Sequence, residues 1–513
     1  MNSFSEYTND VPSEEPDMED TLSECTAESV DFRSTLMERF STEDIEQMES
    51  EIEREIEAYM SAHILGMKQV TFHDDLVKTV AAHFYEQWVM GFGIMDDSES
   101  PEMVEWVREI ADAYFEVGMI PRRETAEQKP MDHTDDMLPV NLAAKLARIR
   151  SVPAVEQRSA EWYAQRQQML TASNAVKIFG TEAARNSLIY EKCQTVDSAT
   201  MEPRYTATHQ PLNDRLAMNW GVKYEPVTLA VYEWLYGEDI LQVGCIPHSK
   251  YSFIGASPDG IVERNGRMIE VKNIYNREIN GVPKDTYWIQ MQWQMETCDL
   301  DECDFVESRF KEFATADEFY EKAANMRAGE EDEKIMGVMV FLIPRIRISE
   351  DGYIPPSVAA AQTSQYVTMP FDVSIDRDSI DAWLRDLCRI EYPHHVIHET
   401  YYWVLDEWSC VLVQRNRAWF AAAVPMVVDT WETIVRERES AEYEHRAPKK
   451  KVRSNSHDIV VHKEQGENHY IRNMPTLSNN VCLIKLESGE YPQREETAAD
   501  IPRESGVRVM HLY

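Results

Sequence analysis

The sequence predicts an α/β protein, in which helices flank a mixed central sheet and an all-α domain precedes it. Three observations predict this class. Between residues 140 and 440, runs rich in β-branched and aromatic residues alternate with apolar residues spaced as on one helix face. Before residue 120, the apolar residues follow the helical spacing. The 513 residues, 43% of them hydrophobic, are enough for two or three domains with a sizeable core.

The N-terminal part divides into an acidic segment and a helical one. Residues 1–34 are rich in Ser, Thr, Asp and Glu, which predicts a disordered acidic tail. Residues 35–120 contain three amphipathic stretches, which predict a small helical domain packed against the domain that follows. Its helices are expected over 41–59, 74–92 and 101–117, with Ser100 as an N-cap and Gly118 as a stop. Polar residues 121–139 predict a linker.

Two carboxylates and a lysine converge within residues 251–272, YSFIGASPDGIVERNGRMIEVK. Residues 251–256 predict a strand, 257–260 a turn, and 267–273 a second strand after an Asn-Gly pair. Asp259 is then at a strand end, while Glu270 and Lys272 share a strand face and Val271 points into the core. Asp and Glu oxygens suit Mg²⁺ or Mn²⁺, and a lysine can activate or orient water. A hairpin with a solvated turn is the alternative interpretation.

Three flanking segments carry a family resemblance. They are EQRSAEWYAQRQQMLTASNAVKIFG at 156–180, WGVKYEPVTLAVY at 220–232 and YWIQMQWQM at 287–295, with a weaker match over 401–437. In this order they resemble the YqaJ-like viral recombinase nucleases, relatives of the phage lambda exonuclease, and are closest to versions carried by large DNA viruses. The resemblance covers about residues 150–440. It implies a PD-(D/E)XK, restriction-endonuclease-like core for the predicted exonuclease domain at 140–440.

The resemblance implies a two-metal catalytic centre. Glu225, Asp259 and Glu270, with the carbonyl of Val271, match the ligands of two Mg²⁺ or Mn²⁺ ions. Lys272 matches the lysine that assists the attacking water.

The resemblance also implies substrate contacts. Arg166 and Ser173 match the R-x6-S element that holds a 5′-phosphate, and Gln290, with Tyr287, matches the Y-x-x-Q helix. Gln290 is counted with the catalytic residues and Tyr287 with the substrate-binding ones. Helical spacing places Tyr287, Gln290 and Gln294 on one face. The alternatives are a solvated polar face for that helix and a simple helix cap at Ser173.

The function expected from these features is a metal-dependent DNA exonuclease. By resemblance it works 5′-to-3′ on double-stranded DNA ends and generates 3′ single strands for viral recombination, repair or replication. Its expected partners are DNA ends, a single-strand annealing protein and further copies of the chain. A structure-specific endonuclease on the same core is one alternative. A DNA-binding or scaffold protein that has a nuclease fold but does not cleave is the other.

Composition limits the cellular setting. With a net charge of −40, any Lys and Arg residues that contact DNA must be separated from most of the acidic residues. Residues 1–60 alone hold 19 acidic and three basic residues. The eight cysteines form no C-x-x-C pattern, which indicates a reduced, intracellular protein, and no apolar run suits a membrane span. Residues 441–513 predict a basic linker and a C-terminal tail. The cluster at 448–453 resembles a nuclear localisation signal, so the expected location is cytoplasmic or nuclear.

Overall fold

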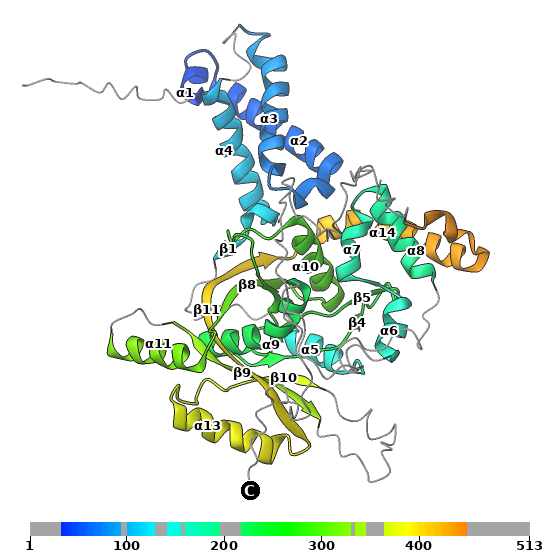
Figure 1. The fold of residues 1–513 in the computed structure, drawn as a ribbon. Helices are drawn as coiled ribbons and strands as arrows, with labels where there is room; N and C mark the ends of the chain where they lie inside the picture. Colours follow the sequence, from blue (N-terminus) through cyan, green and yellow to red (C-terminus); the bar gives the residue numbers. More distant parts are fainter. Residues whose placement is uncertain are drawn as a thin grey trace, which may run out of the picture.

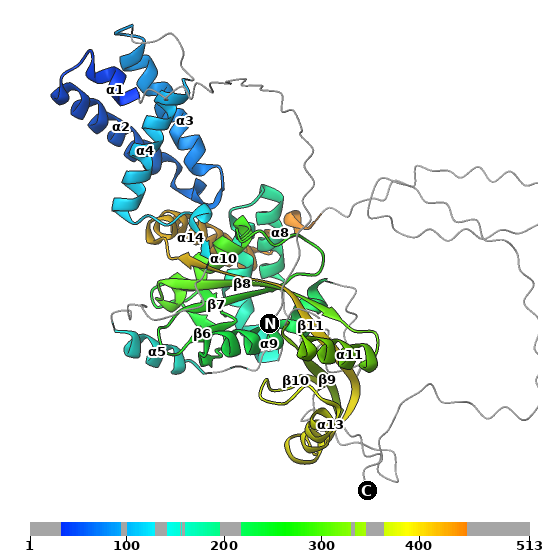
Figure 2. The same cartoon turned by 90° about the vertical axis from the view of Figure 1, so that its left-hand side faces the viewer.

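The structure, a computed structural model, describes residues 32–93, 100–128, 141–153, 155, 160–194, 217–329, 334–344 and 364–448. Within these residues a lobe of helices stands at one end of a mixed α/β domain, and strands β9 and β10 with helix α13 lie at the opposite end (Figures 1 and 2). The expected fold class is confirmed. The lobe consists of α1 (Phe32–Met37), α2 (Thr42–His63), η1 (Ile64–Lys68), α3 (Phe72–Phe84), η2 (Tyr85–Val89) and α4 (Pro101–Gly118).

The apolar stripes read from the sequence form the core of this lobe. Ile45, Ile52 and Ile56 of α2 are buried, as are Leu76 and Val80 of α3. A capping box starts α2, because the Ser41 hydroxyl accepts from the Asp44 N–H at 3.2 Å and the Asp44 carboxylate accepts from the Ser41 N–H at 3.1 Å.

Several boundaries of the lobe differ from the expected ones. The lobe begins at Phe32 rather than at residue 35, because Phe32 is buried against Trp106 with ring centroids 5.6 Å apart. Helix α4 includes Gly118, one residue beyond the expected end, and its C-cap is Met119, which adopts a left-handed conformation. Ser100 does not cap the helix backbone through its side chain, since its hydroxyl donates to the Glu102 carboxylate at 2.7 Å.

The central sheet is mixed. Among the described residues it has eight strands in the order β10-β9-β11-β8-β7-β6-β3, with β1 also paired to β11. Only β7 and β8 run parallel in it. These strands are β1 (Glu127–Gln128), β3 (Ile240–Leu241), β6 (Gly260–Val262), β7 (Met268–Asn273), β8 (Glu302–Glu312), β9 (Met336–Pro344), β10 (Gln365–Thr368) and β11 (His395–Gln414). A second, three-stranded sheet joins β2 (Leu170–Thr171), β5 (Ile254–Ala256) and β4 (Ile246–Pro247).

Two helices cover opposite faces of β7, and the alternation of its side chains decides what each face carries. Ile269 and Val271 pack in a cluster with α9 (Ala217–Tyr236). Met268 packs in the main core with Trp288 of α10 (Asp285–Cys298). The described part of the α/β domain also contains α5 (Leu142–Arg150), α6 (Ala160–Gln167), α7 (Ala172–Ile178), α8 (Glu182–Cys193), α11 (Ala316–Ala328), α13 (Arg377–Asp386), η4 (Leu387–Glu391), α14 (Arg417–Ser440) and η5 (Glu442–Arg446).

Hydrogen bonds join the helical lobe to the α/β domain. The Asn416 amide donates to the Pro121 carbonyl at 2.8 Å, and the Lys68 ammonium donates to the Phe179 carbonyl at 3.1 Å. The first part of the predicted linker is therefore ordered, with η3 (Arg123–Thr125) and β1 in it, and β1 extends the sheet beside β11.

Parts of three predicted segments lie outside the described residues. These are 1–31 of the acidic tail, 129–139 of the linker and 449–513 of the C-terminal segment, which includes 449–453 of the basic cluster. Among the described helices, none is both long enough and apolar enough to cross a membrane.

We expect Phe32→Ala to lower the free energy of unfolding by about 3–5 kcal/mol, because the ring is 1% exposed and its removal leaves a cavity beside Trp106. Urea denaturation followed by circular dichroism measures this. Met37→Ala in the same helix is the control, since Met37 is 51% exposed and should change the value by about 0.5 kcal/mol or less. Equal effects of the two substitutions would contradict the boundary at Phe32.

Candidate active site

A short hairpin brings the first two predicted carboxylates together. β6 and β7 pair antiparallel, and Gly266 takes the left-handed conformation (φ 74°) that their turn requires. Asp259 immediately precedes β6, and its Oδ2 accepts from the Val271 N–H at 2.7 Å. The sequence predicted a strand at 251–256 and a second strand at 267–273. The structure adds β6 between them as the partner of β7, whereas β5 belongs to the smaller sheet. The predicted proximity of Asp259 to the Glu270 strand is nevertheless present.

Glu270 is the centre of the polar contacts. Its side chain is fully buried and forms an ion pair with Lys272. Gln290 Nε2 donates to Glu270 Oε1 at 2.6 Å, and Gln294 Nε2 donates to Glu270 Oε2 at 2.8 Å. The Tyr287 ring centroid lies 5.1 Å from the Lys272 ammonium. The polar face of α10 therefore packs onto the carboxylates and is not a solvated surface.

Gln294 belongs to this site although it was not among the predicted site residues. It is fully buried and binds the same carboxylate as Gln290, one helical turn away. Its place on the face of Tyr287 and Gln290 was visible in the sequence. Only the packing of α10 on β7 shows that this face meets Glu270.

The site carries more negative than positive charge. Burial, together with the carboxylates of Glu270 and Glu225, raises the pKa of Asp259 well above its ordinary value, against the opposing effects of Lys272 and the Val271 N–H. Burial alone would lower the pKa of Lys272, but Glu270 and Asp259 outweigh it and raise that pKa. Glu225, which α9 supplies, is thus close enough to act on Asp259 electrostatically.

The donor set suits a hard divalent cation. Carboxylate oxygens from Glu225, Asp259 and Glu270 are the ligands that Mg²⁺ and Mn²⁺ prefer, and a cation would offset the repulsion that raises the pKa of Asp259. In the described part of the chain, no three Asp, Glu, His or Cys side chains are grouped so that they could hold an ion. The Glu270 carboxylate is paired with Lys272, so a cation bound to the same oxygen would displace that ammonium.

A second polar cluster contains the predicted phosphate-binding residues. Arg166 Nη2 donates to Ser173 Oγ at 3.0 Å and to Thr171 Oγ1 at 3.1 Å. The guanidinium lies 4.4 Å from the Trp162 ring centroid, and burial lowers the pKa of Arg166. The predicted pairing of Arg166 with Ser173 is present. Thr171 and Trp162 complete this cluster and were not predicted as site residues.

The small sheet connects the Arg166 cluster to the segment that carries Asp259. Thr171 of β2 pairs with Gly255 of β5, and the Gly255 carbonyl accepts from Trp293 Nε1 of α10 at 3.1 Å. A Cβ on Gly255 would lie 2.4 Å from the Met169 sulfur, so a larger residue at this position would displace the Met169 side chain. The chain then runs from β5 through a short turn to Asp259.

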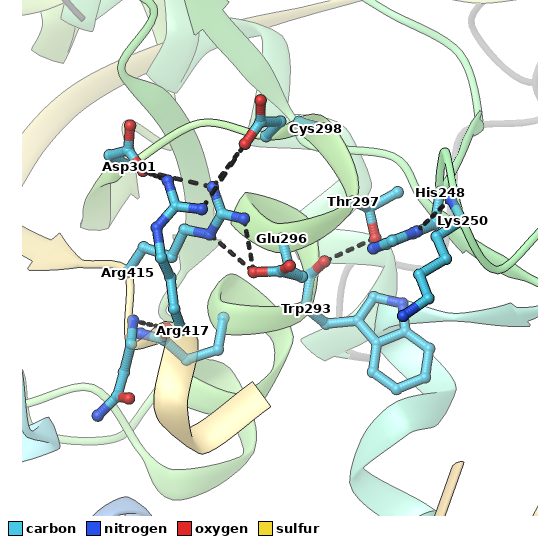
Figure 3. Close-up of polar contacts among 12 residues, drawn as sticks. His248, Lys250, Trp293, Glu296, Thr297, Cys298, Asp301, Arg415 and Arg417 are labelled. Atoms are coloured by element: carbon cyan, nitrogen blue, oxygen red, sulfur yellow. Dashed lines mark hydrogen bonds and ion pairs between the residues drawn. The ribbon is translucent and has the colours of Figure 1, made fainter. Parts of the chain in front are cut away.

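The end of α10 is held by a charged network, shown in Figure 3. Arg415 is almost fully buried and contacts Glu296 at 2.6 Å, Asp299 at 2.9 Å and Asp301 at 3.3 Å. Arg148 donates to the last carbonyls of the helix, those of residues 297 and 298. These contacts restrain the rotation and position of α10, and hence the direction of its glutamines.

Comparisons with known proteins agree with the motifs. Residues 161–301, which contain every predicted site residue, match the YqaJ-like viral recombinase domain. A relative, uncharacterized protein R354 of Acanthamoeba polyphaga mimivirus, is 23% identical over 314 residues, which are 56% of this chain and 54% of the relative. The chain thus matches about half the length of that protein.

Solved structures of an alkaline exonuclease (LHK-Exo) from Laribacter hongkongensis, one of them in complex with dAMP, are also similar to this chain. Each is 20% identical, with 56% of this chain and 98% of the other covered and a TM-score of 0.30.

We expect Asp259→Asn to raise the free energy of unfolding by at least about 1 kcal/mol at pH 8 in EDTA. The raised pKa of Asp259 means that the folded state loses stability as pH rises above the ordinary Asp value, a loss that Asn lacks. The gain should therefore shrink as pH falls towards 4. Urea denaturation at several pH values tests this, with Asp317→Asn, 90% exposed in its side chain, as the control.

An unchanged or lower stability of Asp259→Asn at pH 8 would contradict the electrostatic description of the site.

Proposed function

We propose that this chain, whose residues 161–301 match the YqaJ-like viral recombinase domain, is a metal-dependent exonuclease that acts on the ends of double-stranded DNA. It would hydrolyse one strand in the 5′-to-3′ direction and leave a 3′ single strand for viral recombination, repair or replication. Its partners would be DNA ends, a single-strand annealing protein and further copies of the chain.

The grouping of Asp259, Glu270 and Lys272 under the glutamine face of α10 carries this proposal. Two carboxylates can bind a divalent ion, and a neighbouring lysine can exchange a proton with water. Phosphodiester hydrolysis requires both. Gln290 and Gln294 hold both oxygens of Glu270, so the carboxylate is oriented before substrate arrives.

In the proposed mechanism Glu225, Asp259, Glu270 and the Val271 carbonyl would hold two Mg²⁺ or Mn²⁺ ions. When bound, such ions lower the pKa of a water and stabilise the charge that develops on the phosphate. Lys272 would orient the attacking water and exchange a proton with it, from a position fixed by Glu270.

The Arg166 pocket would select the DNA end. Its guanidinium and the Ser173 hydroxyl offer charge-assisted hydrogen bonds of the kind that hold a phosphate, while Trp162 supports the guanidinium from one side. A terminal 5′-phosphate held there would place the next phosphodiester nearer the carboxylates. Tyr287, beside Lys272, would contact the substrate.

A duplex labelled separately at its 5′ and 3′ ends tests the proposal. We expect Mg²⁺-dependent release of nucleotides from the 5′-labelled end, and no cutting of closed circular DNA. Asp259→Ala and Glu270→Gln should lower the rate at least about a hundredfold, because each removes a ligand from an ion whose charge stabilisation is worth several kcal/mol. Lys272→Met should lower the rate while DNA binding remains.

Glu263→Gln is the control for these variants, since Glu263 lies just after β6 and pairs with Arg150 on the surface. It should keep the wild-type rate. Wild-type turnover by Asp259→Ala would show that the site is misassigned. Cutting of circular DNA would favour a structure-specific endonuclease, and binding without cleavage would favour a scaffold protein.

We expect Arg166→Ala to bring the digestion rate of 5′-phosphorylated duplex down to that of 5′-hydroxyl duplex. Arg166→Lys should restore the difference only in part, because the two-pronged guanidinium contact is lost. Initial rates on the two duplexes measure the preference, with Arg150→Ala, a surface arginine paired with Glu263, as the control. Equal wild-type rates on both duplexes would refute this role of Arg166.

A further inference from the structure

A buried lysine contacts the backbone of Arg166. Lys192, at the end of α8, is 3% exposed, and its Nζ donates to the Arg166 carbonyl at 2.6 Å. We propose that Lys192 is a positioning residue for Arg166 and adds a second buried positive charge to the pocket that binds a terminal phosphate. This inference rests on the proposed function.

The ends of α6 and α8 stabilise each other. The last carbonyls of a helix lack partners within it. At the end of α6, the Arg166 carbonyl accepts a hydrogen bond from Lys192 Nζ. The Gln167 carbonyl accepts one from Arg438 Nη2 at 2.6 Å. The Lys192 carbonyl in turn accepts from Gln167 Nε2 at 2.7 Å and from Arg438 Nε at 2.9 Å.

This reciprocal arrangement fixes the backbone from which the Arg166 side chain extends. Arg438 comes from α14, a part of the chain more than 240 residues away from α8, so three elements meet at one point. A shift of the α6 end would move the guanidinium relative to Ser173, which belongs to a separate helix. The Lys192 ammonium therefore fixes the position of the Arg166 backbone and also supplies a positive charge.

The charges around Lys192 are mostly positive. Burial lowers the pKa of Lys192 to about 8, helped by Arg166, Arg438 and Lys177, while Glu191 opposes the change. Glu191 itself pairs with Lys177 at 2.6 Å. The amount of positive charge behind the pocket thus depends on pH between about 7 and 9.

Other groups near the pocket keep their charge in this range. Arg166 and Arg438 stay protonated. Burial raises the pKa of the Cys193 and Cys245 thiols, so both remain neutral. A terminal phosphate monoester has its second pKa near 6, so it is already a dianion above about pH 7.

The protonation state of Lys192 should affect recognition of the DNA end. Below about pH 8, Lys192 in the free protein is protonated and attracts the phosphate dianion through the Arg166 region. Above this pH the charge is lost, and affinity for a 5′-phosphate should fall relative to a 5′-hydroxyl. Because both duplexes share all other contacts, the ratio of their dissociation constants isolates this effect.

The experiment measures binding of short blunt duplexes with a 5′-phosphate or a 5′-hydroxyl by fluorescence anisotropy, in EDTA, from pH 7 to pH 9. We expect the wild-type preference for the phosphate to fall about fivefold over this range, as for the loss of one nearby charge. Lys192→Met should show the reduced preference already at pH 7 and no pH dependence. Lys192→Arg, which stays charged, should keep the preference at pH 9.

Lys68→Met is the matched control. Lys68 is half-buried and, like Lys192, donates to a backbone carbonyl, in this case that of Phe179 at the other end of α7 from Ser173. Its variant should keep the wild-type preference and pH dependence. Circular dichroism and thermal melting of each variant report folding.

Two results would overturn the inference while leaving the end-recognition proposal intact. One is a wild-type preference that is constant from pH 7 to pH 9, a measurement that needs no variant to fold. The other is a folded Lys192→Met protein with the wild-type preference and pH profile. A wild type without any preference for the phosphate would instead overturn the proposed role of Arg166, and this inference with it.

Discussion

The fully buried carboxylate of Glu270 is the constraint on which the rest of this structure depends. An ionised group taken out of water is very costly unless charge and hydrogen bonds compensate for it. Here Lys272 supplies the charge, and Gln290 and Gln294 supply hydrogen bonds to the two oxygens. Strand β7 and helix α10 must therefore be held in one relative position, and much of the surrounding architecture serves that end.

Helix α10 transmits this constraint through the molecule. Trp288, Met291 and Met295 are fully buried on its apolar side, while Arg415 binds acidic groups at and beyond its last turn. Asn416, next to Arg415, also holds α10: its backbone N–H donates to the Gln292 side-chain oxygen at 2.6 Å. The Asn416 amide also reaches the linker below the helical lobe. The lobe is thus attached close to the elements that orient the two glutamines bonded to Glu270.

The distribution of charge reconciles a strongly acidic protein with a proposed DNA substrate. The carboxylates near Glu270 form a negative centre that suits metal ions, whereas the buried Lys192 and the half-buried Arg166 and Arg438 form a separate positive cluster. Long-range attraction to DNA is weak at a net charge of −40, so binding would depend on short-range contacts with an end. A site that engages a terminal phosphate is consistent with this balance.

The sequence alone determined the features that follow from local periodicity. Alternation along one strand placed Glu270 and Lys272 on the same face, and helical spacing placed Gln290 and Gln294 together; both hold in the structure because a side chain's direction depends on its near neighbours in the chain. The tertiary structure decided that β6, and not β5, pairs with β7. It also decided that Lys192 lies behind Arg166, because contacts between segments far apart in sequence arise from packing and leave no periodic signal.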